Sequence, residues 1–373
     1  MCPPLPHHHS RAVHSEYPVR WIDDDASARA AVAEAQASPV YALDTEFDSG
    51  YRYYPRLCLI QLAWPGQVVL LDPFTVSPEV LAPLFESSSL AVLHAAVVDL
   101  DLLASAGRPR RLFDTQVAAQ LVGLPTPSLA TLALRHGLAL DKSSQRSDWT
   151  RRPISERMRD YAAADVAFLP EICDRLDVEL HRLGRRHWLD EESARTLATP
   201  PAVRDPELAW WKIPAAREMR PSAHLVVQRL AAERERLAKE LDRPAPHVLS
   251  DAALIALTRA RLRARPLPTD PTSTRLLESL RAPVVPGELR ELPAPLTSSQ
   301  TRAVDALMPV VADLAERLSI DRALLATRSD LSLFVSGRPS RLDAGWRAEV
   351  LDGVLAARPA AAVGEEAPVS SLD

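Results

Sequence analysis

The sequence predicts an α/β domain built on a mixed β-sheet, followed by two small all-helical domains. From Val19 to about Ala198, short apolar runs alternate with helical stretches, the pattern of an α/β unit. After a proline-rich break at Thr199-Pro200-Pro201, the apolar residues recur only with helical spacing. A chain of 373 residues, 47% hydrophobic, has room for two or three domains with a sizeable core.

Five short apolar runs in the first part of the chain have the length and composition of strands. They are Val40–Glu46, Arg56–Leu62, Gln67–Leu71, Leu90–Leu93 and Leu112–Asp114. The first three are separated by short turns, one of them marked by Pro65-Gly66. Because a parallel crossover needs a dozen or more residues, these three should form an antiparallel meander. Helices are expected between and after the last two strands.

The second half should contain two helical units with a similar plan. Pro221–Leu241 is predicted as a long helix, and Ser250-Asp251 as the N-cap of a second one. After a proline-rich linker, Thr297 or Ser298 can cap another long helix. Its apolar stripe consists of Val304, Leu307, Val311, Leu314 and Leu318. Ser329-Asp330 is expected to cap a shorter helix, and the repeated plan indicates a weak internal duplication.

Composition indicates the cellular location of the protein more clearly than it indicates the reaction. The N-terminus lacks the features of a signal peptide, and no apolar run is long enough to cross a bilayer. The three cysteines are scattered and indicate neither a disulfide framework nor a metal motif, so a cytoplasmic protein is expected. The net charge of −5 argues weakly against nucleic-acid binding. Residues 207–265, however, hold twelve basic and seven acidic residues.

Acidic residues follow or interrupt three apolar segments, where a carboxylate is costly to bury alone. Asp44 and Glu46 end the first strand and, two residues apart, share one face of it. Asp99 follows the run that ends at Val98, and Asp165 lies in an alanine-rich helix one turn after Tyr161. Four such acids repel one another unless cations lie between them, which indicates a two-metal phosphoryl-transfer site.

Each of these residues also has a plainer interpretation. An Asp-x-Glu pair most often lies on a solvated face, and Tyr161 could simply pack at a core edge. Asp99 could do no more than favour a helix start, and Asp101 competes with it for any role. His94 is interpreted as a strand-end histidine and not as a metal ligand.

Taken in order, these residues resemble the DEDD exonuclease superfamily. Tyr161, four residues before Asp165, matches its DEDDy branch, whereas the sister branch would have a histidine at the position of Asp160. Flanking segments narrow the resemblance to the ribonuclease D family over roughly residues 18–195. They include Asp44-Thr45-Glu46-Phe47, Phe113-Asp114-Thr115-Gln116, Asp141-Lys142-Ser143, Ser147-Asp148-Trp149 and Arg152-Pro153. The resemblance implies a ribonuclease H-like sheet with flanking helices.

The helical half resembles HRDC domains, small nucleic-acid-binding modules. Trp210-Trp211-Lys212-Ile213 and Pro246-His247-Val248-Leu249 carry this likeness, and a more divergent copy follows. The expected organisation is a disordered tail (1–17), a nuclease domain (18–200), two HRDC-like domains (207–288 and 295–358) and a flexible tail (359–373). Trp211, Arg217 and Arg220 are candidates for nucleic-acid contacts, with a structural role equally open for each. The second copy, with eight basic and twelve acidic residues from Glu291 onward, could serve packing instead.

The resemblance also implies a reaction. Asp44, Glu46, Asp99 and Asp165 would hold two divalent ions, Mg²⁺ or Mn²⁺, and Tyr161 would orient the attacking water. The product would be nucleoside 5′-monophosphates released from RNA 3′ ends, for which transfer RNA precursors are the family's usual substrate. Two alternatives stay open: a DNA 3′–5′ exonuclease of the same superfamily, and a non-catalytic RNA-binding adaptor. A monomer without membrane contact is expected.

Overall fold

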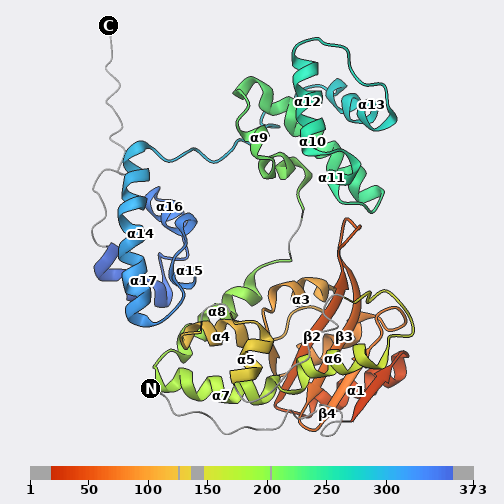
Figure 1. Ribbon diagram of the computed structural model, residues 1–373, viewed down its shortest axis with the longest axis vertical. Coiled ribbons are helices and arrows are strands. Elements are labelled where there is room, and N and C mark those ends of the chain that lie inside the picture. The colour runs from red at the N-terminus through yellow and green to blue at the C-terminus, as the bar shows by residue number, and fades with distance from the viewer. Residues whose placement is uncertain (1–17, 125–126, 136–146, 202–203, 356–373) are drawn as a thin grey trace.

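The computed structural model describes residues 18–124, 127–135, 147–201 and 204–355. The two expected tails, including His7-His8-His9, and the Asp141-Lys142-Ser143 segment lie outside these residues. The described chain forms a sheet covered by helices and two separate groups of helices (Figure 1). None of the described helices is long and apolar enough to span a membrane.

The sheet has six strands in the order β1-β4-β3-β2-β5-β6. The strands are β1 (Val19–Ile22), β2 (Val40–Asp48), β3 (Arg56–Trp64), β4 (Gln67–Leu71), β5 (Leu90–Leu93) and β6 (Leu112–Asp114). β2, β3 and β4 form the expected antiparallel meander, and β5 and β6 add in parallel beside β2. The five strands expected from the sequence are confirmed, with β2 and β3 each two residues longer than predicted.

The first strand and the first helix were not predicted from the sequence. β1 pairs in parallel with β4 at the sheet edge. α1 (Asp25–Gln36) is capped by Asp24, whose carboxylate accepts hydrogen bonds from the backbone of Ala26 and Ser27. The buried face of α1 consists mostly of alanine, so its hydrophobic periodicity is weak.

Helices cover both faces of the sheet. The helices of this α/β unit after α1 are α2 (Ala82–Phe85), α3 (Val97–Leu102), α4 (Thr115–Leu121), α5 (Leu129–Arg135), α6 (Glu156–Ala167), α7 (Leu169–Arg182) and α8 (Arg186–Ala198). Alternate residues of β2 enter different cores, because strand side chains alternate between faces. Leu43 packs in the core that includes α1 and α3 residues, whereas Ala42 packs in the core that includes residues of α4 to α8.

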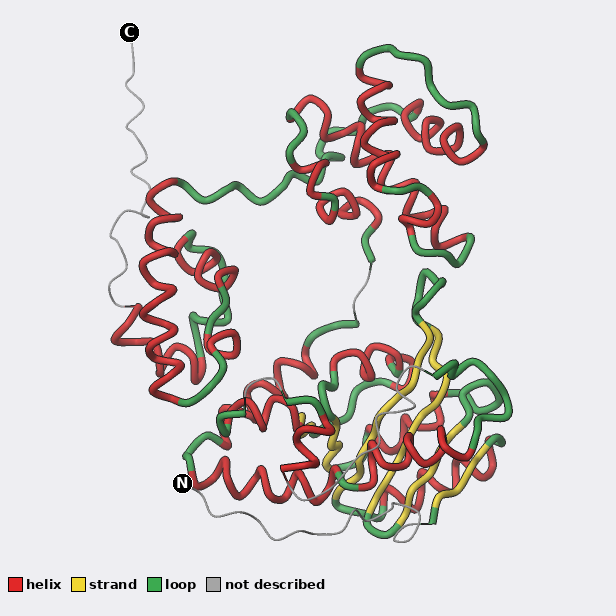
Figure 2. The backbone as a smooth tube through the Cα atoms, viewed as in Figure 1, coloured by secondary structure: helices red, strands yellow, loops and turns green. Residues whose placement is uncertain are grey.

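Two helical groups follow the α/β unit (Figure 2). The first contains α9 (Pro214–Arg217), α10 (Pro221–Glu240), α11 (Ala245–Val248), α12 (Asp251–Leu262) and α13 (Pro271–Glu278). The second contains α14 (Ser298–Leu318), α15 (Arg322–Leu325), α16 (Arg328–Val335) and α17 (Gly345–Leu355). In both, a long helix is followed by a one-turn helix and then by a helix of two or more turns. The long helix and the later helix were predicted from the sequence, whereas the one-turn helices α11 and α15 were not.

One predicted helix cap is wrong and the others are confirmed. Ser250 caps α12, and Thr297 caps α14 in a capping box with Gln300. Ser329-Asp330 does not begin α16, because Thr327 is its N-cap and Asp330 closes the capping box from the third helical position. The helix therefore begins with a Thr-x-x-Asp capping box and not with a cap by the Ser-Asp pair.

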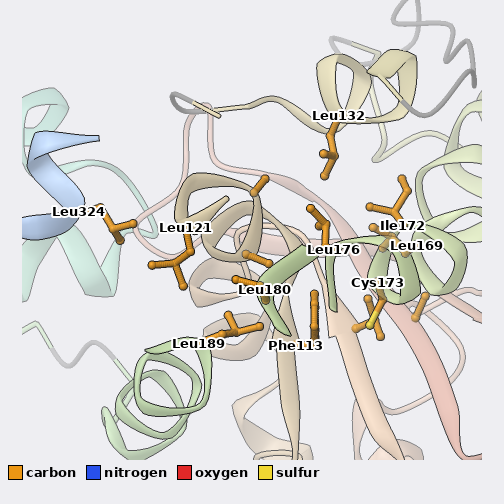
Figure 3. Packing of buried hydrophobic residues seen from close by; sticks show 14 of the residues in the cluster. Phe113, Leu121, Leu132, Leu169, Ile172, Cys173, Leu176, Leu180, Leu189 and Leu324 are labelled. Carbon is orange, nitrogen blue, oxygen red and sulfur yellow. The ribbon is translucent and has the colours of Figure 1, made fainter. Parts of the chain in front are cut away.

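The second helical group packs directly on the α/β unit. Its buried residues, among them Leu324, join one hydrophobic cluster with Leu121 and Phe113 (Figure 3). The indole of Trp346 stacks on Trp188 with ring centroids 4.5 Å apart, and its Nε1 donates to Glu192 at 2.9 Å. These contacts favour the packing role for this group over RNA binding.

The first helical group has its own core and a different contact with the α/β unit. Trp210, Val227, Leu230 and Leu254 are among the residues buried in that core. The group meets the α/β unit at the tip of the β2–β3 hairpin, where Tyr53 packs on α10 and α11. Figure 1 shows this hairpin extending beyond the sheet toward α11.

Candidate functional site

Asp44 and Glu46 lie on β2, on the face that Ala42 shares with the cluster containing α6 residues. Asp44 pairs with Gln61 and Glu46 with Leu59 on β3, and the register shifts between Glu46 and Phe47. Such bulges redirect side chains and occur often beside active sites. The two carboxylates thus share one face of β2, as predicted, although the strand continues to Asp48 beyond its predicted end.

Helix α6 brings Tyr161 and Asp165 to the same place. Residues Ala162, Ala163 and Ala164 are buried, so the helix packs closely on the sheet. Tyr161 and Asp165 are one turn apart, and the phenol donates a hydrogen bond to the Asp165 carboxylate. Asp165 is only 8% exposed, which excludes the interpretation of it as a solvated surface residue.

Asp99 reaches the site from the other side of β2. It lies in the first turn of α3 and is 6% exposed. The hydroxyl of Thr45, between the two β2 acids, donates to Asp99 Oδ1 at 2.5 Å. Asp101 instead pairs with Arg108 at 2.8 Å, so the structure favours Asp99 over its competitor.

A loop before α3 fixes Asp99 and carries backbone strain. Ala95 has a φ of 63°, a left-handed conformation that is unfavourable for alanine. The Asp114 carboxylate at the end of β6 accepts hydrogen bonds from the backbone of Ala95 and Ala96, at 3.0 and 2.9 Å. It also caps α4, so Asp114 is a positioning residue between two elements. This role of Asp114 was not predicted from the sequence, where the residue stood only at a strand end and in a segment that carries the resemblance.

His94 follows β5, as expected for a strand-end histidine. Its Nδ1 lies 3.0 Å from the Thr115 hydroxyl, and burial lowers its pKa. The neutral ring is therefore held in the fold next to the loop that carries Ala95.

Arg152 anchors the segment that leads into α6. Its guanidinium forms two hydrogen bonds with Asp72 at the end of β4, at 2.7 and 2.8 Å. It also donates to the carbonyl oxygens of Cys58 and Trp149, at 2.6 and 2.9 Å. The Trp149 ring in turn lies against Tyr161, with centroids 6.1 Å apart. Arg152 therefore fixes the position of the phenol through Trp149.

The electrostatics of the site are dominated by uncompensated negative charge. Burial raises the pKa of Asp44 well above its ordinary value, and repulsion by Asp99, Asp165 and Glu46 raises it further. Burial also raises the pKa of Glu46 to about 8, of Asp165 to about 7 and of Asp99 to about 6. In the described part of the chain, no lysine or arginine forms an ion pair with any of the four acids.

This donor set suits hard divalent cations, which prefer oxygen ligands. Bound cations would supply the compensating charge that the protein itself does not provide. As the side chains lie, however, no three His, Cys, Asp or Glu residues of the described chain converge closely enough to hold one ion together. Hydrogen bonds from Thr45 and Tyr161 hold the carboxylates of Asp99 and Asp165 in their present orientations.

The three candidate nucleic-acid contacts lie in the first helical group. Trp211 donates from Nε1 to the carbonyl oxygen of Arg290 at 3.0 Å and packs against the core, a structural role. Arg217 and Arg220 are exposed on and just after α9. They do not join the four acids in one site.

Comparison with known proteins identifies the family. A family model described as a 3′–5′ exonuclease matches residues 19–181. Ribonuclease D of Jannaschia sp. is 37% identical over 354 residues, covering 85% of this chain and 89% of that protein. The chain belongs to the ribonuclease D family. The nuclease unit that holds the four acids is therefore a 3′–5′ exonuclease unit.

Further comparisons support the assignment to the ribonuclease D family. Ribonuclease D of Bartonella henselae is 33% identical, covering 86% of this chain and 85% of that protein. The crystal structure of Escherichia coli RNase D superposes with a TM-score of 0.78 at 28% identity, covering 91% of this chain and 98% of that chain. The match extends through both helical groups, so the whole architecture is that of the family, including its ribonuclease H-like sheet.

The raised pKa values predict how stability depends on pH. Folded Glu46 and Asp165 hold protons up to about pH 8 and 7, whereas the unfolded chain has released them near pH 4. The contribution of these two protonated side chains to the free energy of unfolding is greatest at low pH and is lost as pH rises through these values. In EDTA, the melting temperature should fall between pH 6 and 8.5, and the fall should be shallower for Glu46→Gln. If the melting temperature falls equally with pH in the unmodified protein and in Glu46→Gln, the raised pKa of Glu46 would be contradicted.

Proposed function

We propose that this 3′–5′ exoribonuclease removes mononucleotides from RNA 3′ ends at the site formed by Asp44, Glu46, Asp99 and Asp165. The observation that supports the proposal is that four carboxylates, two buried and two half-buried, lie close enough to raise one another's pKa and form no ion pair with a basic residue of the described chain. These residues would hold two divalent ions, Mg²⁺ or Mn²⁺. When bound, such ions acidify the attacking water and stabilise the leaving 3′ oxygen.

Tyr161 has a positional task in this reaction. Burial and the neighbouring carboxylates raise the pKa of its phenol, so it stays protonated and acts as a hydrogen-bond donor. It therefore orients the attacking water, or the phosphate, and does not take a proton from it. Trp149 and Arg152 keep the ring in place. Thr45 and Asp114 do the same for Asp99.

RNA is the favoured substrate because the family relatives are ribonucleases. The Escherichia coli protein is described as an exoribonuclease involved in structured RNA processing. We extend that class of substrate, which includes precursors of transfer RNA, to this chain. Digestion of RNA and DNA oligonucleotides of one sequence, with 5′-labelled ends and Mg²⁺, tests the choice. Shortening of the RNA in single steps with release of 5′-monophosphates supports it, and faster shortening of the DNA opposes it.

Variants of two neighbouring acids in α3 test the site. Asp99→Asn should lower the trimming rate roughly a thousandfold or more, because loss of a metal site removes several kcal/mol of transition-state stabilisation. Asp101→Asn is the matched control, since Asp101 lies on the same helix but pairs with Arg108. Its trimming rate should stay close to that of the unmodified protein. Similar losses in both variants, or none in Asp99→Asn, would contradict the assignment.

Tyr161→Phe tests the positional task separately. The change keeps the ring against Trp149 but removes the hydroxyl that donates to Asp165. We expect kcat to fall by roughly 10- to 100-fold, the equivalent of about 1–3 kcal/mol for one lost buried hydrogen bond. Single-turnover trimming at saturating RNA measures this step, and RNA affinity should be unchanged. An unchanged rate would remove the phenol from the mechanism.

A further inference from the structure

Two tyrosines lie exposed at the tip of the β2–β3 hairpin. Tyr51 is 79% exposed and Tyr54 is 46% exposed, although Tyr53 between them is 1% exposed. Aromatic side chains make up only 5% of the chain, and most of the described ones are buried. Exposed aromatic rings gathered at one place mark a binding surface and not a packing surface.

The hairpin tip is held rigidly against the first helical group. The hydroxyl of buried Tyr53 donates to Glu235 of α10 at 2.9 Å. Its backbone N–H donates to Asp242 at 3.2 Å, and Arg52 pairs with Asp242 at 2.5 Å. The two exposed rings are therefore presented in a fixed arrangement, which lowers the entropic cost of binding a ligand.

Basic side chains from two further segments surround these rings. The Arg204 guanidinium lies 5.7 Å from the Tyr54 ring centroid, and Lys239 Nζ lies 5.9 Å from it. The ring of His247, in α11, lies 6.0 Å from that of Tyr51. All three basic side chains are exposed.

The carboxylates near this surface are already engaged within the protein. Asp242 pairs with Arg52, and Glu235 accepts from Tyr53. Asp48 and Asp205 accept hydrogen bonds from the backbone of Gly50 and Glu207 and keep their negative charge. The surface therefore offers aromatic faces beside the exposed basic side chains of Arg204 and Lys239, a combination that binds single-stranded nucleic acid.

The same strand connects this surface with the four acids. β2 carries Glu46, and Tyr51 follows five residues later. At about 3.3 Å per residue, the two are at most roughly 17 Å apart. A strand whose 3′ end lies at the acids would therefore pass the hairpin tip a few nucleotides upstream.

We propose that the hairpin surface, formed by Tyr51, Tyr54, Arg204, Lys239 and His247, binds unpaired nucleotides of the RNA upstream of its 3′ end. Bases stack on the two tyrosines, and phosphates contact the basic side chains. This inference rests on the proposed function and adds a site for the substrate strand. It assigns the hairpin, and not Trp211, the stacking role.

Binding of a single-stranded RNA 10-mer without metal tests stacking directly. Fluorescence anisotropy in EDTA measures affinity without turnover. The double variant Tyr51→Ala/Tyr54→Ala should bind about tenfold more weakly, as expected for the loss of base stacking. It should also lose the preference of the unmodified protein for the 10-mer over a dinucleotide in kcat/KM. The matching double variant with phenylalanine keeps the rings and should bind like the unmodified protein.

A charge variant tests the phosphate contacts. Arg204→Ala should lower the slope of log affinity against log salt by about 0.7, the value for one phosphate contact on a single strand. Arg29→Ala is the control, because Arg29 is an exposed arginine on α1, paired with Asp25. Its slope should equal that of the unmodified protein.

The outcomes separate this inference from the proposed function. Unchanged 10-mer binding by the alanine double variant would overturn the inference even if the unmodified protein trims RNA. Equal weakening by the alanine and phenylalanine variants would also overturn it, because the rings would then not matter. An unmodified protein that binds the 10-mer at the hairpin but never shortens RNA would refute the proposed function instead.

Discussion

The confinement of four carboxylates, two buried and two half-buried, to one region beside β2 is the constraint on which the rest of the nuclease unit depends. Burial and mutual repulsion raise the pKa values of Asp44, Glu46, Asp99 and Asp165. The fold sustains this unfavourable arrangement through a rigid setting: a central strand and an alanine-rich helix packed closely on the sheet. A protein that served only to be stable would gain by replacing these acids with apolar residues. Their cost is understandable only if cations offset it during function.

Supporting residues explain how the acids stay close. Thr45 and Asp114 hold Asp99 and its loop, and Arg152 holds the segment before α6. The strained backbone at Ala95 belongs to the same arrangement, since its N–H is bound by Asp114. The helical groups divide the remaining tasks. The second packs on the nuclease through Trp346 and Glu192, and the first meets it at the hairpin.

Much of this could be predicted from the sequence, for physical reasons that differ by residue. Backbone periods placed Asp44 with Glu46 and Tyr161 with Asp165, because each pair lies within one regular element. Asp99 and Asp101 could not be separated, since the choice depends on Thr45 and Arg108, contacts between distant segments. β1 and α1 escaped detection because short strands and alanine-rich helices have weak patterns. The stacking candidate Trp211 proved to be bonded to Arg290, a contact across 79 residues.

Counting bound Mn²⁺ by electron paramagnetic resonance tests the central claim most directly, because it needs no substrate. Free Mn²⁺ gives a signal that is lost on binding, so a titration yields the number of ions held per chain. The account predicts two ions for the unmodified protein at pH 8 and impaired binding for Asp44→Asn. Binding should weaken toward pH 6, where Glu46 and Asp165 retain their protons. A protein that binds no Mn²⁺, or an Asp44→Asn variant that binds it equally well, would contradict the account.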